Sequence, residues 1–331
     1  MQGHARLPVM WILLVLLVSA AALSLTLGAY PIPLLDSIAA ISGHGDEMTV
    51  QVMQDIRLPR MLGAMLVGGA LAAAGTAFQL LFRNPLVSPD VLGVSSGAGL
   101  GAATALYIGL PVLAVQGFAF GGGILAVVLV TLLCRTLQHA DRSLVLVLTG
   151  VVLGALAGAL TSLLKIMADP YDQLPAITFW LLGSLSGLQM NEIFLIAPVV
   201  LFAWLLLYLL RWRLDILSLS EQEAQAVGVK PQPIRIAVIA LATLMTSAVV
   251  AVSGVVGWIG LLVPHAARLL VGPGLSRLLP VSSLMGALFL LVVDSASRSL
   301  GEVEIPLGIL TALLGAPFFL VLLLKRSKVA A

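Results

Sequence analysis

The stretch Arg57–Gly101, RLPRMLGAMLVGGALAAAGTAFQLLFRNPLVSPDVLGVSSGAGLG, decides the fold of this chain. It opens with two arginines on either side of Pro59 and continues as an apolar run over 61–82, which is long enough to cross a bilayer. The segment 84–90 contains two prolines and breaks the backbone before a second apolar run. A break at membrane depth is tolerated only where protein or a water-filled cavity covers it. The stretch therefore predicts two spanning helices joined by a short, ordered turn.

Small residues recur at helical spacing in this stretch, at Gly68, Ala72 and Gly75. Two GxxxGxxxG series follow, in Gly93–Gly101 and in Gly150–Gly158. Such residues let neighbouring helix backbones approach closely in lipid. They predict a close-packed helix bundle and no particular chemistry.

The composition places the chain among polytopic membrane proteins. Of its 331 residues, 60% are hydrophobic and 10% are charged, whereas a soluble chain carries about 25% charged residues. A net charge of +2 gives no electrostatic footprint for nucleic-acid binding. The single cysteine, Cys134, excludes an intramolecular disulfide and a cysteine-rich metal site, and we expect it to be a buried thiol on a helix. The four histidines show no metal-ligand spacing, so no metal site is predicted.

Ten apolar segments indicate an all-α protein with a single transmembrane domain over residues 1–331. They lie near 9–29, 61–82, 92–108, 112–134, 143–167, 193–210, 234–256, 258–271, 280–299 and 306–324. The first is about 20 residues long, more than the roughly 7–15 of a signal-peptide core, so we expect a retained helix. The third and eighth are short for a span and need tilt, local thinning or shielding by neighbours.

The basic residues orient the chain. With ten crossings and a cytoplasmic N-terminus, 13 of the 17 lysines and arginines fall on the cytoplasmic side. The four on the other side are Arg57, Arg60, Lys165 and Arg298. Because cytoplasmic loops carry an excess of Lys and Arg, this asymmetry predicts that both termini lie in the cytoplasm.

Two connections are predicted to contain short helices. The longest outer connection has a candidate interfacial helix at Pro33–Ile41. In the longest inner connection Ser220 fits an N-cap, Glu221 and Glu223 lie in the first turn, and Gly228 ends the helix. A polar, capped helix at this place is either a docking element for a partner or a solvated connector.

Three charged side chains fall near the outer ends of predicted helices. Lys165 either snorkels to the interface or lines an outer cavity for an anionic solute, because a lysine at the bilayer centre costs about 2.5–3.5 kcal/mol. Asp294 and Arg298, four residues apart, are predicted to form a structural ion pair. His265, which follows Pro264, is interpreted as a hydrogen-bonded turn residue and not as a ligand.

The sequence contains no nucleophile–base constellation and no phosphate-binding loop of the form GxxxxGKS/T. We therefore predict no catalytic residue and no enzyme activity in this chain. If ATP drives the protein, another chain binds the nucleotide.

These residues resemble one family over nearly the whole chain: the permeases of type II ABC importers for iron-siderophores, haem and cobalamin, the FecCD/BtuC-like family. The matching blocks are RLPR at 57–60, RNPLVSPDVLGVSSGAGLG at 83–101, LSLSEQEAQAVGV at 217–229, GWIGLLVPHAARLL at 257–270, LLPVSSLMGALFLLVVDSASR at 278–298 and EIPLGILTALLGAPFF at 304–319. The chain departs from the family in the loop 272–277, where the usual Asp-His-Arg retains only Arg277.

The resemblance implies a ten-helix permease subunit that pairs with a second permease subunit, identical or related, around a central path. Two cytoplasmic ATP-binding subunits would carry ATP and magnesium, so no cofactor is expected in this chain. A periplasmic substrate-binding protein would deliver the cargo. The residues of the coupling helix, which lodges in a groove on the ATPase, would be Ser220, Glu221, Glu223, Ala224 and Gly228.

The resemblance also implies roles for residues on the outer side and along the path. Arg57, Arg60 and Arg298 match outer-face arginines that meet acidic residues of the binding protein, where arginine–carboxylate pairs offer fixed geometry. An alternative for Arg57 and Arg60 is a role as interfacial anchors. Ser143, at the inner end of the fifth segment, is a gate candidate, and Lys165 would stand near the outer mouth.

The sequence thus predicts a multi-pass permease of the bacterial inner membrane that imports an iron complex as partner chains hydrolyse ATP. A ferric siderophore is the first expectation for the cargo, with haem, cobalamin and molybdate as alternatives. The rival of another class is an ion-coupled secondary transporter, which would need membrane-embedded carboxylates or broken-helix ion sites. Only Asp294 is available near the membrane, and an arginine lies nearby.

Overall fold

The computed structural model describes residues 7–28, 30–136, 142–217, 223, 226, 228, 230–300 and 303–330. These residues form helices and the turns between them and contain no strand. The helices are α1 (Leu7–Thr26), α2 (Leu34–Ile41), α3 (Glu47–Gln51), α4 (Leu58–Leu81), α5 (Val94–Tyr107), α6 (Val112–Thr136), α7 (Arg142–Met167), α8 (Gln173–Leu182), α9 (Met190–Leu209), α10 (Arg211–Ile216), α12 (Pro231–Ser253), α13 (Ile259–Val271), α14 (Leu275–Ser299) and α15 (Leu307–Ala330). A π-helix, η1 (Val52–Arg57), and a 3-10 helix, η2 (Pro89–Leu92), lie between them.

The predicted all-α membrane fold is confirmed. Over the described ranges, seven helical stretches are long and apolar enough to cross a membrane, and shorter apolar helices accompany them. The ten predicted segments correspond to α1, α4, α5, α6, α7, α9, α12, α13, α14 and α15. The helix α8 was not predicted, because ten residues with an internal proline are too short to register as a span.

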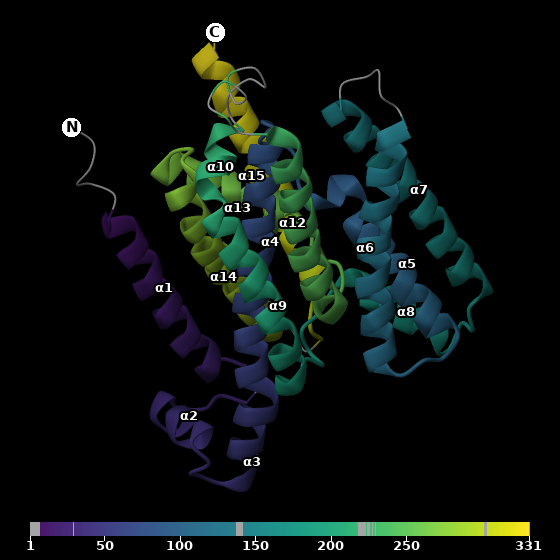
Figure 1. The fold of residues 1–331 in the computed structure, drawn as a ribbon. Helices are drawn as coiled ribbons and strands as arrows, with labels where there is room; N and C mark the ends of the chain where they lie inside the picture. Colours follow the sequence, from purple (N-terminus) through teal and green to yellow (C-terminus); the bar gives the residue numbers. More distant parts are fainter. Residues whose placement is uncertain are drawn as a thin grey trace.

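Figure 1 shows α4 running through the middle of the bundle, where it contacts α9, α12, α13 and α14. The helices α5 to α8 form a second group at one side, and this group contacts the rest of the bundle largely through α12. The helices α2 and α3 lie at one end of the molecule, which we call the α2 end. The last turns of α15 lie at the other, which we call the α15 end.

The central helix begins earlier than the sequence predicts. The elements α3, η1 and α4 form one continuous run, Glu47–Leu81, so Arg57 and Arg60 lie inside a helical run and not before it. Pro59 has no backbone N–H to donate, and the π-helical turns of η1 carry the chain up to this proline. The most apolar window of the run is 78% buried, which makes α4 the core helix of the bundle.

Glycines form the closest helix crossings, as the sequence predicts. A Cβ on Gly75 would overlap the carbonyl oxygen of Gly260 in α13, and a Cβ on Gly68 would overlap that of Gly286 in α14. The helices therefore pack backbone against backbone at these points, as small residues allow in membrane bundles.

The turn between α4 and α5 is ordered, as predicted. Arg83 adopts a left-handed conformation with φ of 50°, and η2 leads into α5 at Gly93. The 14 residues of α5 are shielded by α6 and α7, in part because Gly97 meets the backbone of α6 and Gly150 meets that of η2. The second glycine series does not pack over its whole length, because a Cβ on Gly158 would meet no atom within 4 Å.

The structure also tests the predictions for the segment Pro33–Ile41, for Cys134 and for His265. The short helix expected at Pro33–Ile41 is α2, and Cys134 is buried. The interpretation of His265 as a turn residue is wrong, because α13 continues through Pro264. That proline leaves the carbonyl of Gly260 without its helical donor, and the helix nevertheless continues where α4 packs closely against that carbonyl.

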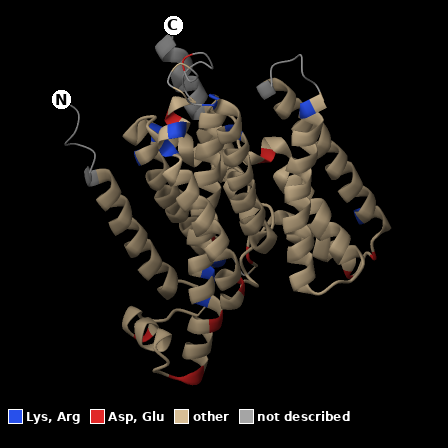
Figure 2. Cartoon of the chain, viewed as in Figure 1, with Lys and Arg blue, Asp and Glu red and all other residues tan. Residues whose placement is uncertain are grey.

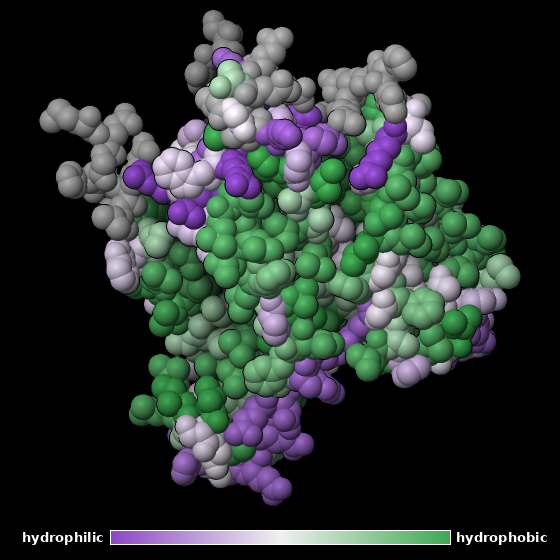
Figure 3. Space-filling view, in the orientation of Figure 1, coloured by the Kyte–Doolittle hydropathy of each residue, from purple (hydrophilic) through white to green (hydrophobic). Residues whose placement is uncertain are grey.

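Charge and hydropathy divide the molecule into layers. Figure 2 shows lysines and arginines gathered toward the α15 end, and acidic residues concentrated at the α2 end with a smaller basic group nearby. Figure 3 shows an apolar band between these polar ends. This layering is that of a protein that crosses a bilayer.

Replacement of Gly75 by alanine tests the close crossing. We expect Gly75→Ala to lower the free energy of unfolding by about 1–3 kcal/mol, because the methyl group must displace the backbone of α13. Gly158→Ala is the matched control and should be neutral or stabilising, since alanine is favoured over glycine by roughly 1 kcal/mol in a helix. Thermal unfolding of both variants in detergent measures the difference, and equal stabilities would contradict it.

Candidate functional site

Four charged side chains form one network at the α2 end of the bundle. Asp294 in α14 is fully buried and accepts a hydrogen bond of 2.7 Å from Arg60 Nε in α4. Arg298 Nε lies 3.3 Å from the other carboxylate oxygen, which confirms the predicted ion pair. Arg60 Nη1 also donates to Glu304, at 2.7 Å, and Glu304 is 45% exposed. The network therefore runs from the closed interior of the bundle to its surface.

Arg57 and Arg298 hold the C-terminal end of α1. The guanidinium of Arg57 donates to the backbone carbonyls of Leu25 and Tyr30. The guanidinium of Arg298 donates to the carbonyl of Ser24 at 3.2 Å and to its hydroxyl at 2.8 Å. The last carbonyls of a helix have no intrahelical donor and carry the negative end of the helix dipole. Two cations therefore fix α1 against the end of η1 and against α14.

The structure brings the three predicted docking arginines together but turns their charges inward. Arg57 is 4% exposed and Arg60 is 2% exposed, and Arg298 is nearly as buried. Docking through these arginines stays a prediction. The sequence analysis missed the two partners of Arg60, because Asp294 and Glu304 are 234 and 244 residues away along the chain. Only the local pair of Asp294 and Arg298 gave a signal in the sequence.

The surface at the α2 end, beside this network, is acidic and hollowed. Asp46 caps α3 by accepting a 2.9 Å hydrogen bond from the backbone N–H of Thr49, and hydrogen bonding to Thr49 lowers the pKa of Asp46. A cavity of about 410 Å³ between α2 and α3 includes Asp36 and His44 in its lining. The described residues nevertheless contain no group of three His, Cys, Asp or Glu side chains placed to hold a metal ion.

At the α15 end, the base of the predicted coupling loop is anchored to two helices. Arg83, in the turn after α4, donates from Nε and Nη2 to the carbonyl of Leu217, at 2.9 and 2.7 Å. Asp215 in α10 accepts a 3.1 Å hydrogen bond from the backbone N–H of Leu275, where α14 begins. These contacts tie the start of the loop to both α4 and α14.

The loop itself is described only in part. Glu223 is exposed and helical, and Gly228 adopts a left-handed conformation with φ of 76°. Ser220, Glu221 and Ala224 lie outside the described residues. The role of all five residues in coupling stays a prediction.

The helix α7 has a largely uncovered face. Only 11% of its most apolar window is buried, so this helix offers a long surface to a partner or to a path. Lys165, in its last turn, is half-buried and forms no ion pair with the described residues. The backbone of Ser143 belongs to the first turn of α7, and its side chain lies outside the described part. Neither pathway residue is tested by this geometry.

A carboxylate that the sequence analysis did not single out lies in the break before α5. Asp90 accepts hydrogen bonds from the hydroxyls of Ser88, at 3.3 Å, and Ser95. The side chain of Asp90 remains exposed while its neighbours pack against α7. A carboxyl group is thus fixed where the backbone leaves the helix between two apolar segments.

Comparison with known proteins identifies the family of this chain. The model of the FecCD transport family matches residues 14–325. The chain belongs to the FecCD transport family. It is a multi-pass membrane permease of the type II ABC importer class, a class whose permeases work with ATPase subunits and a binding protein.

The relatives carry different cargoes. The chain is 41% identical to the molybdate import system permease protein MolB of Haemophilus influenzae over 99% of this chain and 98% of MolB. It is 39% identical to the Fe(3+) dicitrate transport system permease protein FecD of Escherichia coli over 81% of this chain and 82% of FecD. A solved inward-facing structure of a metal-chelate type ABC transporter is 39% identical and superposes with a TM-score of 0.88, over 96% of this chain and 99% of that one.

Replacement of Asp294 tests the network. Asp294→Asn should lower the free energy of unfolding by about 3–5 kcal/mol, because it leaves two buried guanidinium groups without their shared counter-charge. Glu304→Gln, at the exposed edge of the same network, should cost less than about 1 kcal/mol. Chemical unfolding of both variants in detergent gives the comparison. A loss no larger for Asp294→Asn than for Glu304→Gln would contradict the structural role.

Proposed function

We propose that this chain forms one half of a permease that receives an iron complex from a periplasmic binding protein and passes it into the cytoplasm. Two partner subunits hydrolyse ATP with Mg²⁺ and supply the energy. The observation that carries the proposal is the family match over 14–325, together with relatives named for the import of metal species. The second permease subunit is either another copy or a related chain.

A ferric siderophore is the proposed cargo, and molybdate is the second candidate. Molybdate is supported by the similarity to MolB, which extends over 99% of this chain. Haem and cobalamin remain alternatives within the same class. Lys165 is half-buried on the sparsely covered helix α7 and favours a cargo with negative charge.

The proposed orientation places the α15 end in the cytoplasm and the α2 end outside. Its support is the concentration of basic residues toward the α15 end, since cytoplasmic segments carry the excess of Lys and Arg. The membrane is then the bacterial inner membrane, with both termini inside.

The proposed coupling runs through the loop that begins at Leu217. ATP-driven closure of the partner subunits would push on the segment that contains Ser220, Glu221, Glu223, Ala224 and Gly228. The hydrogen bonds from Arg83 to Leu217 would transmit that movement to the turn between α4 and α5. The helices would then shift as nearly rigid bodies between outward- and inward-open states, with Ser143 near the inner gate.

The proposed docking face for the binding protein is the α2 end. Arg60 already holds a carboxylate there, that of the half-exposed Glu304. A carboxylate of the binding protein would take the place of Glu304 on Arg60, with Arg57 and Arg298 contributing positive charge from behind. Because these arginines are buried and hold α1, α4 and α14 together, their reversal would disrupt the fold, and Glu304 is the better probe.

Uptake into proteoliposomes tests the proposed function. With the ATPase and binding protein supplied, we expect ATP-dependent uptake of one ferric siderophore from a panel that includes haem, cobalamin and molybdate. Lys165→Met should slow uptake of an anionic cargo severalfold without loss of assembly, because it removes the positive charge near the outer mouth. Uptake of molybdate alone would select the second candidate, and uptake without ATP or binding protein would contradict the importer.

Replacement of Arg83 tests the coupling route. Arg83→Gln removes the hydrogen bonds to Leu217 and should reduce the cargo imported per ATP hydrolysed by about tenfold. Arg213→Gln, an exposed arginine on α10, is the control and should change this ratio little. Parallel assays of uptake and phosphate release supply the ratio. An unchanged ratio in Arg83→Gln would show that the contact between Arg83 and Leu217 does not contribute to coupling.

Replacement of Glu304 tests carboxylate exchange. Glu304→Ala removes the internal competitor for Arg60 and should tighten binding of the binding protein by about threefold to tenfold. Glu47→Ala, another exposed acidic residue at the α2 end, is the control for a general change in charge. Equilibrium binding to the assembled transporter measures both. Weaker binding with Glu304→Ala would show that Glu304 itself contacts the partner.

A further inference from the structure

A groove runs between α6 and α12, where the two groups of helices meet. It has a volume of about 430 Å³ and an almost wholly apolar lining. The lining on α6 includes Ile124, Val128, Thr131 and Arg135, and the lining on α12 extends from Ile236 to Leu244. Both sets recur at three- and four-residue spacing, so each helix presents one continuous stripe to the groove.

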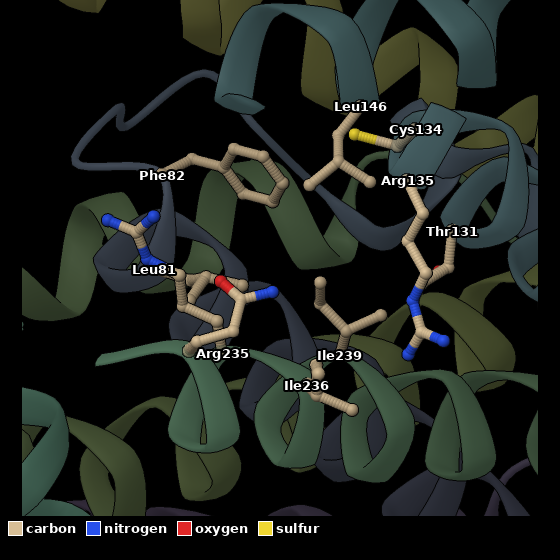
Figure 4. A pocket seen from close by; sticks show the side chains of 10 residues that line it. Leu81, Phe82, Thr131, Cys134, Arg135, Leu146, Arg235, Ile236 and Ile239 are labelled. Carbon is tan, nitrogen blue, oxygen red and sulfur yellow. The ribbon is translucent and has the colours of Figure 1, made fainter. Parts of the chain in front are cut away.

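The groove is charged at one end only. A smaller pocket continues it past Thr131 and Ile239 toward the end of α4, and this pocket is lined by both Arg135 and Arg235. Figure 4 shows this part, with Arg135 and Thr131 on one side and Leu81 and Phe82 on the other. Arg135 lies in the last turn of α6 and Arg235 near the start of α12. Both arginines therefore lie toward the α15 end, where the other basic residues gather.

The length of the groove matches one leaflet of a bilayer. The lining on α6 extends from Ile124 to Arg135, a rise of about 16 Å along the helix. One leaflet contributes about 15 Å to the hydrocarbon core. The two arginines thus stand near the level of the headgroups, and the apolar stripes reach to about the bilayer centre.

The shape of the groove fits a lipid chain and not a helix. The cavity of about 430 Å³ is elongated along the two apolar stripes, as a single acyl chain requires. A helix is about 10–12 Å wide with its side chains, which is much wider than one acyl chain. Val128 and Leu132 are about half exposed at the rim, as expected for a groove open to lipid.

We propose that this groove is a binding site for an anionic phospholipid. The phosphate lies at the end of the groove lined by Arg135 and Arg235, and one acyl chain extends along the facing stripes of α6 and α12. The complementarity is that of a molecule with a negative head and an apolar tail to a groove with a positive end and an apolar length. The lipid fills the seam between the α5–α8 group and the α4 group and holds the two together. The proposal does not depend on the cargo.

Native mass spectrometry of the purified full-length chain tests the site. The probes are phosphatidylglycerol and phosphatidylcholine with identical acyl chains, supplied in equal amounts. We expect about tenfold more retained phosphatidylglycerol, and a preference near one in Arg135→Gln/Arg235→Gln. The matched control, Arg211→Gln/Arg213→Gln, removes two positive charges from α10 and should keep the preference. An unchanged preference in the first double variant would overturn the proposal.

A second pair of variants tests the apolar part of the groove. Val128→Trp fills the groove and should reduce retained phosphatidylglycerol severalfold. Leu125→Trp adds the same side chain to an exposed position of α6 that does not line the groove, and should retain the lipid. Equal retention in the two variants would overturn the proposal.

Two further outcomes separate the lipid from other occupants. Excess inorganic phosphate should leave phosphatidylglycerol bound, and complete displacement would reduce the site to a simple anion site. A photo-crosslinking residue at position 128 should label phospholipid in the membrane. Labelling of a second copy of the chain would make the groove a subunit interface and overturn the lipid assignment.

Discussion

The arrangement of helices at the α2 end depends on the buried carboxylate of Asp294. This carboxylate is fully buried between Arg60 of α4 and Arg298 of its own helix. A buried charge is costly to desolvate, and its arrangement is stable only with close partners in good geometry. Arg60 on α4 and Asp294 on α14 are far apart in the sequence. Their pairing therefore favours one packing of α4 against α14. Arg298 also donates to the carbonyl of Ser24 near the end of α1, and the neighbouring Arg57 donates to that of Leu25.

The helix α4 connects this charge network to the opposite end of the bundle. Its 24 residues span about 36 Å, with Arg60 near one end and Arg83 just past the other. Arg60 belongs to the charge network, and Arg83 binds the carbonyl at the base of the loop proposed to meet the ATPase. Glycine contacts with α13 and α14 pack the helix tightly along its length. A single, well-packed helix thus connects the two faces on which an importer must act, and this suits movement of the bundle as a nearly rigid body.

Much of this fold is predictable from the sequence, because hydropathy and segment length determine which stretches enter a membrane. The ten apolar segments, the ordered break at 84–90 and the close approach at Gly68 and Gly75 all follow from local patterns. The continuation of α4 back through Arg57 does not, since a proline between two arginines is typical of a helix start. Nor does the pairing of Arg60 with Asp294, because no local spacing records a contact across 234 residues. The sequence therefore identifies Arg57, Arg60 and Arg298 as candidate functional residues. Their burial becomes evident only from the packed structure.

A double-mutant cycle on Arg60 and Asp294 tests the central role of the buried network most directly. The free energy of unfolding would be measured for Arg60→Met, Asp294→Leu and the double variant. Arg60→Met leaves the buried Asp294 with Arg298 alone, and Asp294→Leu leaves Arg298 without its counter-charge and Arg60 with Glu304 alone. Each single variant should cost about 3–5 kcal/mol. The double variant should cost less than the sum of the two by at least about 2 kcal/mol, because it removes both charges together. Costs that add to within about 0.5 kcal/mol would show that the pair is not coupled and would contradict this account.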